Sequence, residues 1–531
     1  MAGIVEELLE PQMSLGNTAP AQRFETAEGW VQRSYGDLRE LAESTADLLH
    51  ERGVRRSDRV AIQVRTRADW SVVDFAVALL GATLVPVYPT AAPAQLLDIL
   101  QRTEPVVLVV ESGAELPDLG TDGPRVLRLG DDDGDLGELT APAGQPARTA
   151  PPAEMEDLYS ISFSSGSTGK PKGCLLTHGN YVAVVSMAIA AETHPKDGLA
   201  HRRFSFVYLP LAHASARLQQ LTTFAAGGEL VYGSGDTPNI LRQIAQVGPT
   251  YVPGVPRLFE SAYLRADRNP ETLRRTFGSR LVYALTGGAP IAPSMLETYA
   301  NAGISLVEGY GLTETSTALT LSSPHDTRPG TVGRALVGVQ LRIAEDGEIL
   351  ARGPNIFAGY LDDEKATSDA LRDGWFHTGD LGSIDHDGYL TVTGRKKNLI
   401  VTSTGKNVAP EYAENIFRQS CRLDGVVVAG EGRPYLIAVV TAGAHLVDDA
   451  ELVAAARQAN SDVSPPEWIR KIVVVDRALS RYRGELTDSG KVVRHQVLSN
   501  LDNVVDTVYR GYPVDGVRVI DTVPQSRPVA V

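Results

Sequence analysis

A run of glycines and small hydroxyl residues, followed by two lysines, carries the strongest chemical signal in the sequence. It reads YSISFSSGSTGKPKG and spans residues 159–173. Glycines allow successive backbone N–H groups to converge on an anion, while hydroxyl groups add donors and a lysine adds positive charge. The pattern predicts a phosphate-binding loop made by Ser165, Gly166, Ser167, Thr168, Gly169 and Lys170.

Two residues distinguish this loop from the P-loop of many nucleotide-binding proteins. A P-loop needs a second glycine five residues before Gly169 and a Ser or Thr directly after the lysine. The sequence has Ser164 and Pro171 at those positions, and a proline prevents a helix from running straight out of the loop. A flexible linker is the alternative interpretation, but the apolar residues on both sides favour a loop held between buried elements.

Lysine is rare and unevenly placed in this chain. There are nine lysines against forty-one arginines, and none precedes Lys170. Lys491 stands out because Gly490 and Val492 flank it in a Gly-containing segment near the end of the chain. A compact, mobile ammonium group is the property that lysine offers and arginine does not. A coding bias would explain the same numbers, so composition alone leaves both interpretations open.

The first part of the chain alternates helix and strand patterns, as expected of a scaffold that positions such a loop. Apolar spacing predicts helices over residues 35–52 and 71–82. Strands are predicted at 59–64, 84–88 and 106–110, the last being a continuous apolar run typical of a strand buried on both faces. This alternation predicts an α/β fold with a large N-terminal domain of mostly parallel sheets flanked by helices.

The pattern of apolar runs and turns changes in the last third of the sequence. From about residue 338, shorter apolar runs are separated by Glu-Asp-Gly and His-Asp-Gly turns, which are hairpin signals. Helix and strand patterns mix again over residues 407–509. We therefore predict a large domain over 1–393 and a small mobile α+β domain over 394–531. The tail after Tyr509 shows no period, and the Asp-rich stretch 131–152 is predicted to be a solvent-facing loop.

Composition excludes several classes of protein. The 50 Lys and Arg residues and 65 Asp and Glu residues give a net charge of −15, which argues against wrapping a nucleic acid. Only Cys174 and Cys421 occur, which fits a reducing cytoplasm rather than a disulfide framework. The acidic N-terminus does not have the pattern of a secretion signal. The most apolar window, residues 72–88, contains Asp and Pro and is short for a membrane span, so we expect a buried helix followed by a strand.

Several separated motifs, in order, resemble the acyl-adenylate-forming superfamily of acyl-CoA synthetases, peptide-synthetase adenylation domains and luciferases. The resemblance covers about residues 35–509. Besides the phosphate loop, it rests on VEGYGLTET (307–315), RGPNIFAGY (352–360), DGWFHTGDLG (373–382), GRKKNLIVTSTGKNVAPE (394–411) and GELTDSGKVVR (484–494). The segments LPLAHASARLQQ (209–220), GVPRLFE (254–260) and KNLIVTSTGKNVAP (397–410) resemble the long-chain fatty-acyl-CoA synthetase branch in particular.

The resemblance implies an ATP and AMP site made of residues from these motifs. Thr313 is expected to bind the α-phosphate, Tyr310 to lie on the adenine, Asp380 to accept the ribose hydroxyls, and Arg395 to reach nucleotide oxygens. Glu314 is the implied Mg²⁺ ligand. Further nucleotide-binding residues implied by the same motifs are Gly287, Gly288, Ala289, Glu308, Gly309 and Gly311.

The resemblance also implies roles in catalysis and in acceptor binding. Lys491, Thr168, Glu314 and His213 are the implied catalytic residues, with His213 at the acyl pocket. Lys397 matches the hinge about which the small domain rotates. CoA binding is implied for Gly405, where the thiol arm would pass, and Lys406. One departure is Asn398, which stands where the family commonly has Asp or Glu.

We expect an ATP-, Mg²⁺- and CoA-dependent acyl-CoA synthetase acting on a medium-chain, long-chain or bulky hydrophobic carboxylic acid. The nearest rival hypothesis is a half-reaction specialist, which would load a carrier protein or use an acyl-AMP made by another enzyme. Two more distant rivals are a phosphotransferase, which would release ADP, and a non-catalytic adenylate-binding protein. The sequence leaves the acid, the acceptor, the pathway and the oligomeric state open.

Overall fold

The computed structural model describes thirteen stretches of the chain. They are residues 3–13, 16–139, 152–164, 171–192, 203–287, 291, 293–323, 326–403, 405–421, 423–443, 447–461, 463–487 and 490–522. The predicted phosphate-binding residues 165–170, together with Gly288 and Ala289, lie outside these stretches.

Two large sheets form most of the fold within the described residues. The seven-stranded sheet has the order β18-β8-β7-β4-β3-β5-β6, and the nine-stranded sheet has the order β15-β14-β13-β12-β11-β9-β10-β1-β2. The first comprises β3 (Arg59–Gln63), β4 (Thr83–Pro86), β5 (Val107–Glu111), β6 (Arg125–Leu129), β7 (Leu158–Ser164), β8 (Lys172–Thr177) and β18 (Gly359–Tyr360). The second comprises β1 (Pro20–Thr26), β2 (Gly29–Ser34), β9 (Phe204–Val207), β10 (Glu229–Tyr232), β11 (Tyr251–Gly254), β12 (Tyr283–Gly287), β13 (Ser305–Tyr310), β14 (Thr320–Leu321) and β15 (Arg334–Ala335).

Parallel pairing dominates the centre of both sheets, as the alternating sequence pattern predicts. The consecutive pairs from β1 through β10, β9, β11 and β12 to β13 are parallel, and so are the pairs among β3, β4, β5, β6 and β7. Antiparallel strands occur at sheet edges, for example β8 beside β7. Parallel strands direct their carboxyl ends to one edge of a sheet, which is where ligands bind in open α/β folds.

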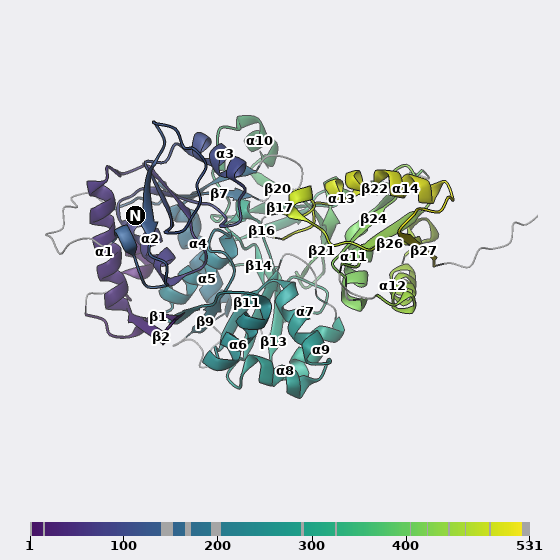
Figure 1. Cartoon of the computed structure of the whole chain (residues 1–531), viewed down its shortest axis with the longest axis horizontal. Coiled ribbons are helices and arrows are strands. Elements are labelled where there is room, and N and C mark those ends of the chain that lie inside the picture. Colours follow the sequence, from purple (N-terminus) through teal and green to yellow (C-terminus); the bar gives the residue numbers. More distant parts are fainter. Residues whose placement is uncertain are drawn as a thin grey trace, which may run out of the picture.

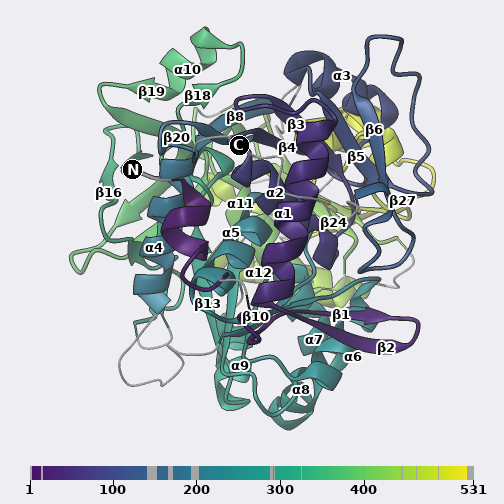
Figure 2. The same ribbon diagram turned by 90° about the vertical axis from the view of Figure 1, so that its left-hand side faces the viewer.

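Helices cover both faces of these sheets and also fill the space between them. The main hydrophobic core joins inward-facing residues of both sheets with α1 (Tyr35–Glu51), α2 (Ala68–Leu79), α4 (His178–Glu192) and α5 (Ala214–Ala225), which lie together in Figure 2. The outer helices are α3 (Pro93–Thr103) on the seven-stranded sheet and α6 (Thr237–Val247), α7 (Pro256–Arg265), α8 (Pro270–Phe277) and α9 (Pro293–Asn301) on the nine-stranded sheet.

The remaining elements lie toward the C-terminus. A five-stranded antiparallel sheet contains β16 (Gln340–Ile343), β17 (Glu348–Arg352), β19 (Leu371–Arg372), β20 (Trp375–Ile384) and β21 (Leu390–Arg395), with α10 (Glu364–Ala370) beside it. The last part has a hairpin of β22 (Ile400–Val401) and β23 (Asn407–Val408) and a sheet of β24 (Gly425–Ala429), β25 (Leu436–Thr441), β26 (Ile469–Val475) and β27 (Val517–Asp521). Its helices are α11 (Pro410–Ser420), α12 (Asp449–Ser461), α13 (Arg494–Asn500) and α14 (Asp502–Tyr509), and the group forms its own body in Figure 1.

The sequence leaves the tail after Tyr509 unassigned, and its expectation for the Asp-rich stretch needs correction. The tail after Tyr509 contains β27, which pairs antiparallel with β26 over residues 517–521. The Asp-rich stretch is not a simple solvated loop where it is described, because Asp133 accepts a hydrogen bond from the Ala68 N–H at the start of α2. Buried Arg67 also donates to the backbone oxygens of Gly130 and Asp135. The acidic loop therefore closes over a buried cation.

The apolar window that the sequence shows at residues 72–88 folds as a buried helix, α2, followed by strand β4. Within the described ranges, none of the helices combines the length and apolar composition that a membrane crossing requires. A cytoplasmic location stays a prediction from the sequence.

Candidate functional site

A single large cleft, with a volume of about 2160 Å³, contains most of the described residues that the sequence singles out. It runs along the carboxyl ends of β12 and β13, past β20 and β21, to the segment that carries Lys491. The predicted residues that line it are His213, Gly287, Glu308, Gly309, Tyr310, Gly311, Thr313, Glu314, Asp380, Arg395, Lys397 and Lys491. The last strand residue before the predicted phosphate loop, Ser164, and the first residue after it, Pro171, also line the cleft.

The strands on either side of the predicted phosphate loop confirm part of the sequence argument about Pro171. Strand β7 ends at Ser164, and β8 begins at Lys172 and runs antiparallel to β7. A strand, and not a helix, therefore follows the loop. The Lys172 ammonium lies 4.8 Å from the centre of the Tyr360 ring, on the side of the cleft where β8 meets β18.

Asp380 joins two other predicted nucleotide-binding residues. Its Oδ2 accepts a hydrogen bond from Tyr310 Oη at 2.8 Å, and its Oδ1 pairs with Arg395 Nε at 2.8 Å. Asp380 is only 3% exposed, and this burial raises its pKa while the Arg395 charge opposes the increase. A carboxylate has about four lone-pair positions, so two remain for hydroxyl donors of a ligand.

The GYGLTE segment holds its residues in a constrained turn. Gly311 is required there because a Cβ atom would lie 1.9 Å from the backbone oxygen of Thr317. Thr317 itself has a φ of 96°, which is strained for a β-branched residue and is typical of ligand sites. Glu314 follows in the same turn, and its Oε1 accepts a hydrogen bond from Tyr360 Oη at 2.9 Å.

Glu308 is a buried carboxyl group on β13. Its Oε1 accepts a hydrogen bond from the backbone N–H of Ile291 at 3.1 Å. Burial raises the pKa of Glu308 to about 7, against the effect of that hydrogen bond. At neutral pH this position is therefore partly protonated, unlike an exposed glutamate.

His213 caps the N-terminus of α5 at the edge of the cleft. Its Nδ1 accepts from the Ser215 N–H at 3.2 Å and lies 2.8 Å from Ser215 Oγ. Burial, together with the nearby Lys491 charge, lowers the pKa of His213 to about 4. His213 is therefore neutral, and its Nε2 carries the proton.

Lys491 lines the same cleft but belongs to the C-terminal part of the chain. It lies on a turn in which the Thr487 N–H donates to the Lys491 oxygen at 2.8 Å. Much of the side chain is exposed, yet the ammonium group is close to enough protein for desolvation to lower its pKa. The Arg395 charge lowers it further, and Asp380 has the opposite effect. The Lys397 pKa is also lowered, first by burial and then by Arg395. These cations converge on a space suited to a polyanion.

Two predicted residues do not reach the cleft in this structure. Gly405 forms the turn between β22 and β23 with a φ of 77°, and a Cβ atom there would meet no neighbouring atom. The need for glycine is therefore set by the turn and not by crowding in this arrangement. Lys406 does not line the cleft itself but pairs at 3.5 Å with Glu467, which does.

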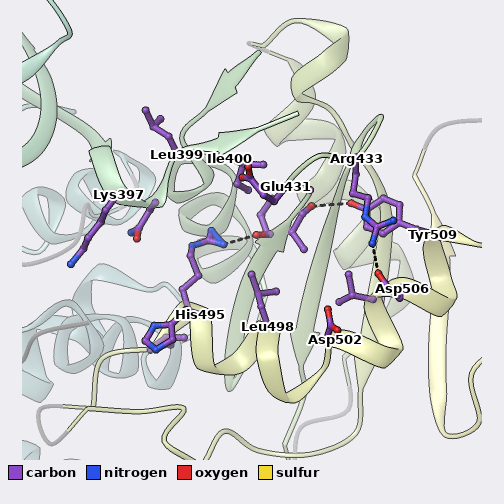
Figure 3. A pocket seen from close by; sticks show the side chains of 17 residues that line it. Lys397, Leu399, Ile400, Glu431, Arg433, His495, Leu498, Asp502, Asp506 and Tyr509 are labelled. Atoms are coloured by element: carbon purple, nitrogen blue, oxygen red, sulfur yellow. Dashed lines mark hydrogen bonds and ion pairs between the residues drawn. The ribbon is translucent and has the colours of Figure 1, made fainter. Parts of the chain in front are cut away.

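A second, smaller groove of about 480 Å³ lies beside the predicted hinge, and its lining includes Lys397, Arg433 and Arg494. Figure 3 shows Arg433 pointing toward Asp506, with which it pairs. Arg494 donates to the backbone oxygen of Val428. Both arginines of this groove are thus already engaged within the C-terminal part.

Sequence reasoning missed two side chains that shape the site. Tyr360 binds Glu314 through its hydroxyl group, although it stands at the end of the RGPNIFAGY motif that the sequence displays. Asn398, noted in the sequence only as a departure, donates from Nδ2 to Glu411 Oε1 at 2.6 Å. The motif could have indicated Tyr360, but nothing local in the sequence pairs Asn398 with a residue on the next helix.

Known proteins resemble the chain along most of its length. The model of the AMP-binding enzyme family matches residues 14–361, and that of the AMP-binding enzyme C-terminal domain matches residues 397–512. The long-chain-fatty-acid–CoA ligase FadD15 of Mycobacterium bovis is 34% identical over 541 residues, covering 86% of this chain and 89% of that protein. A Rhodococcus jostii ligase, named for the CoA ester of a methyl-dioxo-octahydroindenyl propanoic acid, is 29% identical and covers 88% and 94% of the two chains.

Solved structures agree with this relationship. ATP-bound MatB of Rhodopseudomonas palustris superposes with a TM-score of 0.79 at 25% identity, covering 95% of this chain and all of that one. The o-succinylbenzoate CoA synthetase MenE of Bacillus subtilis, with its acyl-adenylate intermediate, gives a TM-score of 0.78 at 22% identity over 94% and 98% of the chains, a likeness of fold. The fold, the cleft and the family match together place this chain in the family of AMP-binding enzymes.

Proposed function

We propose that the protein is an ATP-dependent acyl-CoA synthetase that activates a hydrophobic carboxylic acid through an acyl-AMP and transfers the acyl group to CoA. The observation that carries the proposal is the position of Lys491. Lys491 is distant in sequence from the nucleotide motifs. In the fold it lies near enough to His213 to lower the pKa of that ring, and Arg395 and Asp380 lie near enough to affect the pKa of Lys491. The family relationship supports the same activity.

The chemistry explains why cations gather in the cleft. In the first step a carboxylate oxygen attacks the α-phosphorus of ATP, and pyrophosphate leaves with the electrons of the broken P–O bond. Two anions approach each other in that step, so positive charge fixed at the reacting oxygens lowers its barrier. Lys491 and Arg395 supply such charge. An arriving anion would also restore the pKa of Lys491, which its present surroundings lower.

Magnesium fits the donor set through one carboxylate. No group of three or more His, Cys, Asp or Glu side chains among the described residues could hold a metal ion by itself. Mg²⁺ commonly uses one or two carboxylates together with water and substrate phosphate oxygens. Glu314, beside the cleft and fixed by Tyr360, would supply that carboxylate. The ion would neutralise phosphate charge.

In the second step the CoA thiol attacks the acyl carbonyl carbon and AMP leaves. Gly405 and Lys406 lie outside the cleft in the present arrangement, whereas Lys491 lies inside it. A rotation of the C-terminal part about Lys397 would exchange these two segments. We therefore propose residues 1–393 and 394–531 as the two moving domains, with the present structure in the arrangement for adenylation. A half-reaction specialist, loading a carrier protein or using supplied acyl-AMP, is the rival.

The direct test is a pyrophosphate-release assay with purified protein, ATP, Mg²⁺ and a panel of acids. The panel should include linear acids of increasing length and bicyclic oxo acids, because the relatives are named for both kinds. We expect acid-dependent pyrophosphate and AMP, and a CoA thioester by mass analysis. ADP as the product would identify a phosphotransferase instead. Absence of pyrophosphate with every acid would contradict adenylation.

The role of Lys491 can be tested by separating the two half-reactions. Lys491→Ala should reduce acid-dependent pyrophosphate release by at least about a hundredfold, because one fixed charge at a developing anion is worth several kcal/mol. Thioester formation from supplied acyl-AMP and CoA should stay near the wild-type rate. Lys365→Ala is the control, since Lys365 is exposed and pairs with Asp369 of its own helix. Equal loss of both half-reactions would refute the proposed division.

A further inference from the structure

One face of α5 forms a continuous part of the cleft wall beyond His213. Ser215, Leu218, Gln219 and Thr222 all line the cleft, and their spacing of three and four residues places them on a single helical stripe. His213, at the start of this helix, lies near Lys491. The stripe therefore extends away from the point where the acid is proposed to react, as a wall for its acyl part.

Gln219 and Thr222 are the buried polar members of this stripe, at 4% and 3% exposed, and Gln219 is the one that carries a side-chain amide. Its Nε2 donates to Ser205 Oγ at 2.7 Å and to the Phe206 backbone oxygen at 3.0 Å. The Phe206 oxygen can only accept, so this contact fixes the amide with its nitrogen toward β9. Among the residues that the structure describes, none donates to the remaining atom, Gln219 Oε1.

Gln219 lines the cleft, so water reaches Oε1 while the cleft is open. A bound acid that fills this part of the cleft would remove that water, and an acceptor then left without a donor is costly. Other hydroxyl groups nearby are satisfied internally: Thr222 Oγ1 donates to the Gln219 backbone oxygen at 3.1 Å, and Thr223 Oγ1 to the same oxygen at 2.7 Å. Thr317 Oγ1, on the strained turn that also lines the cleft, is buried without a partner in the described structure. The cleft wall thus carries hydrogen-bonding capacity, and Gln219 Oε1 on α5 is the part that a plain hydrocarbon chain would leave unused.

We propose that the acid carries a hydroxyl group that donates to Gln219 Oε1 when the acid is bound. The proposal rests on the proposed function and names a subclass of its substrate: a hydroxylated hydrophobic acid rather than a saturated hydrocarbon acid. An apolar pocket discriminates weakly between acids, whereas a pocket with an unpaired polar group penalises the acid that leaves it unpaired.

The position of the hydroxyl follows from helix geometry. Gln219 is six residues beyond His213, which corresponds to ~9 Å along the helix axis at ~1.5 Å per residue. Each bond of an extended saturated chain advances ~1.25 Å, so this distance spans roughly seven bonds. A hydroxyl near the eighth carbon of the acid would therefore reach Gln219, and one beside the carboxylate would not.

Three matched acids test this inference: octanoic, 8-hydroxyoctanoic and 2-hydroxyoctanoic acid, compared by kcat/KM for pyrophosphate release. We expect the wild-type protein to prefer 8-hydroxyoctanoic over octanoic acid by about tenfold, the worth of one hydrogen bond to a buried acceptor. The 2-hydroxy isomer, which has the same polarity, should show no such preference. Equal or better use of octanoic acid would overturn the inference without touching the proposed function, which fails only if every acid is inactive.

The matched variants are Gln219→Met, which removes the acceptor at similar volume, and Thr223→Val, which disturbs the same backbone oxygen outside the cleft lining. In Gln219→Met the ratio of the kcat/KM values for 8-hydroxyoctanoic and octanoic acid should fall to about one, whereas Thr223→Val should keep the wild-type ratio. Retention of the full preference in Gln219→Met would overturn the assignment. The wild-type comparison stands by itself if Gln219→Met fails to fold.

Discussion

Asp380 illustrates how one carboxylate can organise a site before any ligand arrives. Tyr310 and Arg395 occupy one oxygen each, so the ring proposed to lie on the adenine and the cation proposed to reach the nucleotide are held at fixed positions around it. Neutralising Asp380 would therefore disturb both Tyr310 and Arg395. The sequence indicates each of them separately, but the shared carboxylate is visible only in the fold.

The buried ring of His178 should make the free energy of unfolding depend on pH. It is fully buried, its Nδ1 accepts from the Ile4 N–H at 3.1 Å, and burial lowers its pKa from 6.5 to about 4. Between these values the unfolded chain binds a proton that the folded protein does not. Stability from this group is therefore complete above pH 6.5 and is lost as the pH falls toward 4.

We expect His178→Gln to remove this pH dependence. Between pH 7 and pH 5, the His178 contribution to the free energy of unfolding should fall by about 2 kcal/mol in the wild-type protein. Urea unfolding at both pH values should show a correspondingly smaller loss in the variant. His386→Gln, at an exposed turn position, is the control. Identical pH dependence in wild type and His178→Gln would show that another group is responsible.

At the scale of elements, a buried ion pair joins the helices between the two large sheets. Arg217 on α5 pairs through Nη2 with Asp74 Oδ1 on α2 at 2.7 Å, and both side chains are fully buried. Tyr159 on β7 donates to the same carboxylate at 2.9 Å. Within the described structure Arg217 Nε and Nη1 have no hydrogen-bond partner, but the Tyr159 and Tyr181 ring centres lie 4.4 and 5.3 Å from the guanidinium carbon. This pair connects α5 and α2 to β7, the strand that precedes the predicted phosphate loop.

Replacing one partner of this pair should lower the free energy of unfolding more than replacing both partners. Asp74→Leu alone leaves the Arg217 charge uncompensated and should lower the free energy of unfolding by about 3–5 kcal/mol. Asp74→Leu combined with Arg217→Met should recover most of that loss, because an apolar pair avoids the desolvation of two charges. Urea titration of the single and double variants measures both effects. A double variant as unstable as Asp74→Leu would contradict this account.

The elements themselves follow the sequence closely where the pattern is local. The predicted helix at residues 35–52 is α1, whose N-cap Ser34 forms a capping box with Asp37. Strand β27 was not predicted because its partner, β26, lies over forty residues earlier and the tail lacks a strict alternation. The buried side of the acidic loop was not predicted because it depends on Arg67, far from it in sequence.

At the scale of the whole molecule, Asn398 and Glu411 connect the segment at the predicted hinge with α11. Asn398 donates to Glu411 Oε1, while Glu411 Oε2 is buried without a partner in the described residues and lies close to Gly394 on β21. Asparagine suits this position because a carboxylate there would face another carboxylate. Because Glu411 also lies close to Gly394 on β21, before the predicted hinge, we propose that this contact favours the arrangement in which Lys491 lines the cleft.

We therefore expect Asn398→Asp to slow adenylation selectively. Repulsion of about 1–2 kcal/mol between two partly buried carboxylates would reduce acid-dependent pyrophosphate release several-fold, up to about tenfold. Thioester formation from supplied acyl-AMP should change less. Adding Glu411→Gln to Asn398→Asp should restore the rate, because the repulsion disappears. No recovery in that double variant would argue against an electrostatic origin.

Much of the candidate site is predictable from motifs, since its residues lie in short segments of fixed order. The proximity of Lys491 to His213 is not predictable from local pattern, because nearly 280 residues separate them and the contact depends on how two parts of the chain meet. Gln219 was not predicted for a different reason. A glutamine on an amphipathic helix gives no sign in the sequence of which amide atom is left unpaired.

Strand β8, which follows the predicted phosphate loop, bears on when positive charge reaches the nucleotide. A helix placed there would offer a permanent positive pole to the nucleotide, whereas β8 offers none. We propose that part of the compensating charge instead arrives with the C-terminal part of the chain, on Lys491. When Lys491 is outside the cleft, the negative charge of the bound nucleotide would be only partly neutralised. Bound ATP would then react slowly with water until the acid is present and the C-terminal part closes.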